Sequence, residues 1–125
     1  MSWLRKVFGG GSQKLTKSQA DQMILQQLKS LGADMSQPRE VLHYLYLPSR
    51  DAARQAAEAL RSKGYSAEER MAANAKDNPP NPFLVLAKNQ IVVTPQATHQ
   101  FRQLFEQLAA FHNGEYDGWE AAAKP

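Results

Sequence analysis

The stretch VLHYLYL, residues 41–47, decides the fold because it is apolar or aromatic at nearly every position. Continuous apolar runs of this kind are typical of a central strand in a sheet that is covered on both faces. Pro48 follows directly and ends the strand, because proline cannot donate a ladder hydrogen bond. We therefore predict a central strand here, with both of its faces buried.

Two helices are predicted around this strand. Before it, Thr16 and Gln19 have the spacing of a capping box, and a helical apolar pattern continues to Gly32. After it, Ser49 is a candidate N-cap, and a narrow stripe of small residues ends at Gly64. The apolar positions are Ala20, Met23, Ile24, Leu28 and Leu31 in the first helix, and Ala53, Ala56, Ala57 and Leu60 in the second.

The second half of the chain predicts two more strands. Residues 65–73 alternate less regularly and carry charges, as expected for an edge strand. The segment KDNPPNP, residues 76–82, predicts an exposed connection because its prolines cannot join a ladder. Residues 83–87 and 91–93 then predict a second central strand, bent or bulged around residues 88–90.

A third helix has a strong start signal, with Thr94 as N-cap and Pro95 at the first helical position. Asn113 and Gly114 end it. Its predicted apolar face consists of Ala97, Phe101, Leu104, Phe105, Leu108 and Phe111.

The order of these elements predicts an α+β fold. It is helix, strand, helix, strand, strand, helix, with a terminal segment that is able to add an edge strand. This order is that of a ferredoxin-like split β-α-β sandwich, an antiparallel sheet with helices on one face, plus an extra N-terminal helix. We expect a flexible basic N-terminal tail in residues 1–15 and one domain in residues 16–125.

Composition favours one globular domain in a reducing compartment. The chain has 125 residues and no cysteine, so we expect a cytoplasmic protein without disulfides or thiolate sites. Neither a secretory signal nor a membrane span is evident in the sequence. Residues 1–17 hold four of the 15 basic residues and none of the 12 acids, so the other 11 bases and 12 acids give a net charge of −1. The basic excess therefore belongs to the N-terminus, and the body does not resemble a phosphate-binding surface.

The sequence offers little for catalysis. His43, His99 and His112 do not have metal-binding spacing, and a histidine inside a strand is most often a hydrogen-bonded structural residue. Glu68 and Glu69 are adjacent in a predicted strand, so they point to opposite faces and do not form a carboxylate pair. We expect no catalytic residue, no metal, no cofactor and no enzyme activity.

RNA binding by the sheet is a rival interpretation. Tyr44, Tyr46 and Phe83 lie on predicted strands and are able to stack bases. The strand that begins at Phe83 is uniformly apolar and lacks the basic and glycine residues of an RNA-binding sheet motif. Packing is therefore the favoured role of the two tyrosines, and direct nucleic-acid binding is the weaker alternative.

Two segments carry a family likeness: SQPREVLHYLYLP, residues 36–48, which runs into the alanine-rich helix, and GEYDGWE, residues 114–120. Together they resemble the RraB family of ribonuclease E inhibitors, and the likeness extends from about Ala20 to Ala122. The resemblance implies a small bacterial regulator that binds ribonuclease E, particularly its non-catalytic scaffold region, and modulates RNA degradation without catalysing a reaction. The alternative is a ferredoxin-like protein- or RNA-binding module with a different partner.

The terminal motif has two interpretations. In the structural one, the chain turns at Asp117 and Gly118 and lays Tyr116 and Trp119 across the core. In the functional one, aromatic anchors ringed by acids form a partner-binding surface suited to a basic ligand. The candidate partner-binding residues are then Arg39, His43, Glu115, Tyr116, Asp117, Trp119 and Glu120.

Overall fold

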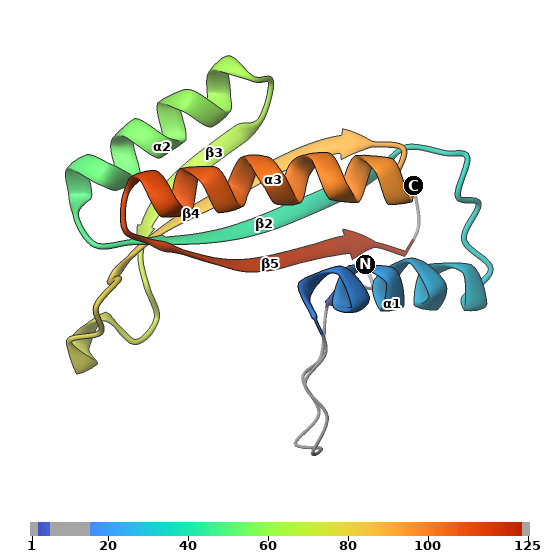
Figure 1. Cartoon of the computed structure of the whole chain (residues 1–125), viewed down its shortest axis with the longest axis horizontal. Helices are drawn as coiled ribbons and strands as arrows, with labels where there is room; N and C mark the ends of the chain where they lie inside the picture. The colour runs from blue at the N-terminus through green and yellow to red at the C-terminus, as the bar shows by residue number, and fades with distance from the viewer. Residues whose placement is uncertain (1–2, 6–15, 124–125) are drawn as a thin grey trace.

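The computed structural model describes residues 3–5 and 16–123, which form three α-helices and a five-stranded antiparallel sheet (Figure 1). The strands lie in the order β1-β5-β2-β4-β3. The elements are β1 (Trp3–Arg5), α1 (Lys17–Ser30), β2 (Arg39–Leu47), α2 (Arg50–Ser62), β3 (Ser66–Met71), the 3₁₀ turn η1 (Ala75–Asp77), β4 (Phe83–Ile91), α3 (Pro95–Phe111) and β5 (Glu115–Ala122).

The four strands after α1 have ferredoxin-like topology. Across the sheet they lie in the order β5-β2-β4-β3, so the last of the four lies beside the first and the third lies beside the second. Every neighbouring pair is antiparallel. Each of the two helices α2 and α3 follows one strand and leads to another, which is the split β-α-β arrangement. The α+β sandwich expected from the element order is confirmed, with α1 as the extra N-terminal helix.

All three helices begin where local capping chemistry predicts. Thr16 accepts a hydrogen bond from the backbone N–H of Gln19, whose side chain returns to the Thr16 backbone N–H. The side chains of Ser49 and Thr94 cap α2 and α3 by accepting a bond from the backbone N–H three residues later, without the returning side-chain bond. These side chains satisfy N–H groups that have no partner within the helix, so each start is encoded locally.

The helices pack on one face of the sheet. Figure 1 shows α2 and α3 over the same side of the strands, with α1 beside β5. Burial alternates along β2, so Val41, His43 and Leu45 are buried under the helices while Leu42 and Tyr44 on the other side are only half-buried. The expectation that residues 41–47 are covered on both faces is wrong, because no described helix packs on the second face.

The register differs from expectation in two places. The pairing of β2 with β4 runs without a break from Arg39 opposite Ile91 to Leu47 opposite Phe83, so the bend predicted around residues 88–90 is wrong. The irregularity lies instead between β2 and β5, where the register shifts between Tyr44 and Leu45.

A bulge in β5 accounts for this shift. Gly118 lies opposite Tyr44 and Tyr116 lies opposite Leu45, so Asp117 is the extra residue between them. Gly118 has φ +104°, a conformation that glycine adopts without a steric penalty. The turn predicted at Asp117 and Gly118 is therefore a bulge within a continuous strand.

Helix α3 buries most of its predicted apolar face, because Phe101 and Phe105 are buried and Leu104 and Leu108 pack against the core. Its buried residues are Thr98, Phe101, Phe105 and Ala109, whereas Phe111 is 78% exposed. Phe111 is six residues after Phe105, which places it about 120° away around the helix. Phe111 was therefore wrongly assigned to the core.

The N-terminal residues contribute a strand that the sequence does not predict. Residues 3–5 form β1, which pairs with residues 120–122 of β5 at the sheet edge. The remainder of the tail expected in residues 1–15 lies outside the described residues. Within the part of the chain that the structure describes, no helix has both the length and the apolar character needed to cross a membrane.

Candidate functional site

Arg39 is fully buried and joins the end of β5 to the loop that follows α1. Its guanidinium donates hydrogen bonds to the carbonyl oxygens of Ala122 and Ala123 at 2.9 Å, and to that of Asp34 at 2.8 Å. These bonds fix the end of β5 and the loop after α1 against β2. Arg39 therefore acts inside the fold and presents no surface to a partner.

His43 and Tyr116 form a second buried pair. His43 Nδ1 and the Tyr116 hydroxyl are 2.8 Å apart, and the imidazole stacks on Phe105 with ring centroids 4.2 Å apart. Burial, and secondarily the positive charge of Arg102, lowers the pKa of His43 to about 3. Burial likewise raises the pKa of Tyr116 well above its usual value. Both groups are thus neutral near pH 7, and they serve the core in the way the structural interpretation predicts.

Trp119 is the largest fully buried side chain in the described residues, and it belongs to a polar network that joins α1, α3 and β5. Its indole Nε1 donates to Asp21 at 2.8 Å, and Arg102 donates to both oxygens of the same carboxylate at 2.7 and 2.8 Å. The Arg102 guanidinium also lies 5.0 Å from the centre of the Tyr116 ring. The hydrogen bonds to Asp21 explain how a buried carboxylate is tolerated beneath the helices.

The seven candidate residues are therefore divided between the two sides of the sheet. Four of them, Arg39, His43, Tyr116 and Trp119, lie in the core on the helix side. The acids Glu115, Asp117 and Glu120 are exposed or half-buried. Of the seven candidates, only these three acids lie outside the core.

The acids of β5 lie beside the tyrosines of β2. Glu115 is opposite Tyr46 in the register. The Tyr44 hydroxyl donates a hydrogen bond to Glu120 at 3.0 Å. We call this second side of the sheet the open face. It comprises Leu42, Tyr44, Tyr46, Leu84 and Leu86, together with the charged residues Glu40, Glu68, Arg70, Lys88, Glu115, Asp117 and Glu120.

The open face has an excess of acids. Among its described side chains there are five carboxylates and two bases, and both bases already have acidic partners. Arg70 donates to Glu68 at 3.0 Å, and Lys88 lies 3.9 Å from Glu40. The described acids of the open face therefore outnumber its described bases, and three of the five acids lie on β5.

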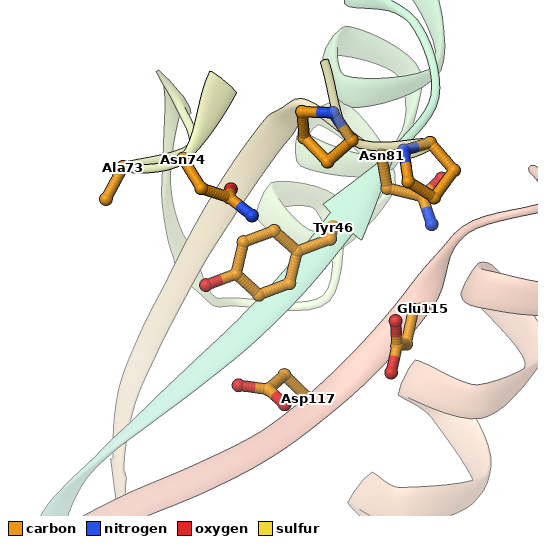
Figure 2. A pocket seen from close by; sticks show the side chains of 8 residues that line it. Tyr46, Ala73, Asn74, Asn81, Glu115 and Asp117 are labelled. Carbon is orange, nitrogen blue, oxygen red and sulfur yellow. The ribbon is translucent and has the colours of Figure 1, made fainter. Parts of the chain in front are cut away.

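A cavity of about 430 Å³ lies at one end of the open face, where β2 ends and β5 begins. The connection between β3 and β4 forms one of its walls. Figure 2 shows the Tyr46 ring nearly face on, with Asn74 and Asn81 on one side and Glu115 and Asp117 on the other. The remaining lining residues are Ala73, Pro79 and Pro80.

The sequence pointed to only part of this cavity. The sequence indicates a partner-binding role for Glu115 and Asp117 in the terminal motif, and packing or base stacking for Tyr46. The proline-rich segment was predicted only as an exposed connection, and nothing in its composition indicates that it returns to the sheet. Its place beside Tyr46 follows from the tertiary fold.

The described residues contain no group of three or more histidine, cysteine, aspartate or glutamate side chains able to hold a metal ion. With its pKa near 3, His43 is also not available to take up a proton near pH 7.

These features define a ferredoxin-like α+β sandwich with an acidic, tyrosine-bearing open face. The sequence model of the family described as Regulator of ribonuclease activity B, RraB, matches residues 18–121, and the chain belongs to this family. No curated protein matches the chain. The resemblance stated from the two sequence motifs is confirmed, and family membership makes the chain a regulator of ribonuclease activity.

Proposed function

We propose that this chain binds ribonuclease E through the open face and slows RNA degradation without catalysing a reaction itself. The observation that carries the proposal is the acid excess of the open face beside Tyr44 and Tyr46 in a member of a ribonuclease-regulator family. Tyrosines supply rigid contact area in protein interfaces, and carboxylates select a basic partner surface. The proposal places the chain in the cytoplasm and requires no cofactor.

Charge favours a protein partner over RNA. Tyr44 and Tyr46 occupy the side of the sheet on which RNA-binding sheets stack bases. The carboxylates beside them repel phosphate, whereas an RNA-binding surface is lined by lysine and arginine. We therefore assign the tyrosines to a protein interface, with an RNA-binding module as the alternative.

Binding of the purified chain to ribonuclease E tests this proposal. The catalytic and scaffold portions of the ribonuclease are immobilised separately, and capture is measured before and after nuclease treatment. We expect capture by the scaffold portion that survives nuclease, together with slower cleavage of a reporter transcript. Capture that disappears with nuclease, or a steep salt-dependent affinity for RNA alone, would instead support the RNA-binding alternative.

A further inference from the structure

The cavity beside Tyr46 has a chemistry that the general acidity of the open face does not explain. An aromatic ring, two carboxylates and two side-chain amides line this space of about 430 Å³. Tyr46 is half-buried and lines the cavity, and Figure 2 shows its ring between the asparagines and the two acids. The electron-rich face of a tyrosine ring attracts a cation, and the positively charged guanidinium group of arginine is one such cation.

The carboxylates lie where they complement such a cation. Glu115 and Asp117 reach the cavity from the same strand, and Figure 2 shows both on one side of the Tyr46 ring. A carboxylate accepts several hydrogen bonds at once, so each acid has capacity for a ligand in addition to any bond within the fold.

The wall opposite the two carboxylates suits the extended, partly apolar stem of a long basic side chain. Pro79 and Pro80 present apolar rings, and the amides of Asn74 and Asn81 offer carbonyl oxygens as further acceptors. Long basic side chains bury their methylene groups against apolar surface while the charged end finds polar partners. The wall and the ring together therefore fit a basic side chain better than a small inorganic ion.

We propose that this cavity binds an arginine side chain of the protein partner. Arginine fits better than lysine because its flat guanidinium stacks on an aromatic ring and its fork of N–H groups matches carboxylates. Phosphate is excluded by the two acids. This inference rests on the proposed function, in which the open face binds a protein, and it adds the side chain that the cavity recognises.

A small probe tests the cavity without the ribonuclease. The full chain is titrated with N-acetyl-arginine amide, and backbone and side-chain NMR shifts are followed. We expect shifts centred on Tyr46, Asn74 and Glu115, and shifts at least about threefold smaller at equal concentration with N-acetyl-lysine amide. The neutral citrulline analogue should give none. Equal responses to all three compounds, or shifts elsewhere in the chain only, would overturn the assignment.

Variants connect the cavity to the partner. The double substitution Glu115→Gln with Asp117→Asn should weaken capture of ribonuclease E by about tenfold or more, since charge-assisted hydrogen bonds are lost. Tyr46→Leu should weaken capture while its circular dichroism stays unchanged. The matched control is Asp51→Asn with Glu58→Gln, which removes two exposed acids from α2 and should leave capture unchanged.

The two experiments separate failure of the cavity from failure of the proposed function. Arginine binding without ribonuclease capture would support the cavity and contradict ribonuclease E as the partner. Capture that is insensitive to the cavity variants would support the partner and overturn the cavity.

Discussion

Asp21 on α1 accepts a hydrogen bond at 2.8 Å from the indole of Trp119 on β5, although the two residues lie 98 positions apart in the sequence. The same carboxylate receives two bonds from Arg102 on α3. One buried acid therefore attaches the extra N-terminal helix to the ferredoxin-like core. It also gives the indole N–H of Trp119 a partner inside the core.

Substitution of Asp21 by alanine should destabilise the fold strongly. The change leaves the Arg102 charge and the Trp119 N–H without their acceptor, and breaking a buried ion pair costs about 3–5 kcal/mol. Urea unfolding measures the effect, with Glu58→Ala on the exposed side of α2 as control. A loss below about 1 kcal/mol would show that the network does not hold α1 in place.

His43 should make stability depend on pH. Its pKa is about 3 in the fold, compared with about 6.5 in the unfolded chain, so the unfolded state binds more protons between these values. The contribution is fully present above about pH 6.5 and is lost as the pH falls toward 3, at up to about 1.4 kcal/mol per pH unit. His43→Gln should flatten the slope between about pH 6 and pH 4. Parallel curves for the two proteins would contradict the shift.

Gly114 is required by close approach rather than by its dihedral angles. A Cβ there would lie 2.3 Å from the carbonyl oxygen of Tyr46 and 2.6 Å from a methyl carbon of Leu47. Gly114→Ala should therefore force β5 away from β2 and cost about 1–3 kcal/mol. Thermal unfolding measures the cost, and displaced NMR shifts at Tyr46 would locate it. Wild-type stability and spectra would contradict this account.

Two phenylalanines of α3 should respond very differently to alanine. Phe105 is fully buried, so Phe105→Ala should cost about 3–5 kcal/mol. Phe111 is 78% exposed, so Phe111→Ala should change stability by less than about 0.5 kcal/mol. Urea unfolding of the pair tests whether Phe111 lies outside the apolar face of α3. Equal losses of stability in the two variants would show that Phe111 belongs to the apolar face of α3, as the sequence predicts.

Features encoded by neighbouring residues were predictable from the sequence. The caps Thr16, Ser49 and Thr94 act on backbone groups three residues away, so each helix start can be recognised locally. The element order then limited the fold to a small set of topologies. The pairing of residues 3–5 with β5 joins segments more than 110 residues apart, so no local sequence pattern predicts it.

The candidate site was predictable only in part, for a related reason. Burial along β2 alternates, but residues 41–47 are apolar or aromatic on both sides, so the sequence does not reveal which side is open. The bulge at Asp117 keeps both Tyr116 and Trp119 under the helices while the acids of β5 lie on the open face. The terminal motif, residues 114–120, is continuous in the sequence, but its aromatic residues and its acids lie on opposite sides of the sheet.

The most direct test of the account is inhibition of ribonuclease E by an open-face charge reversal. Cleavage of a reporter transcript is measured with the wild-type chain, with Glu115→Lys plus Glu120→Lys, and with the α2 control Asp51→Lys plus Glu58→Lys, after circular dichroism confirms that all three are folded. The account predicts that the wild type and the control slow cleavage while the open-face variant loses most of its inhibition. Equal inhibition by all three proteins would contradict a role for the open face.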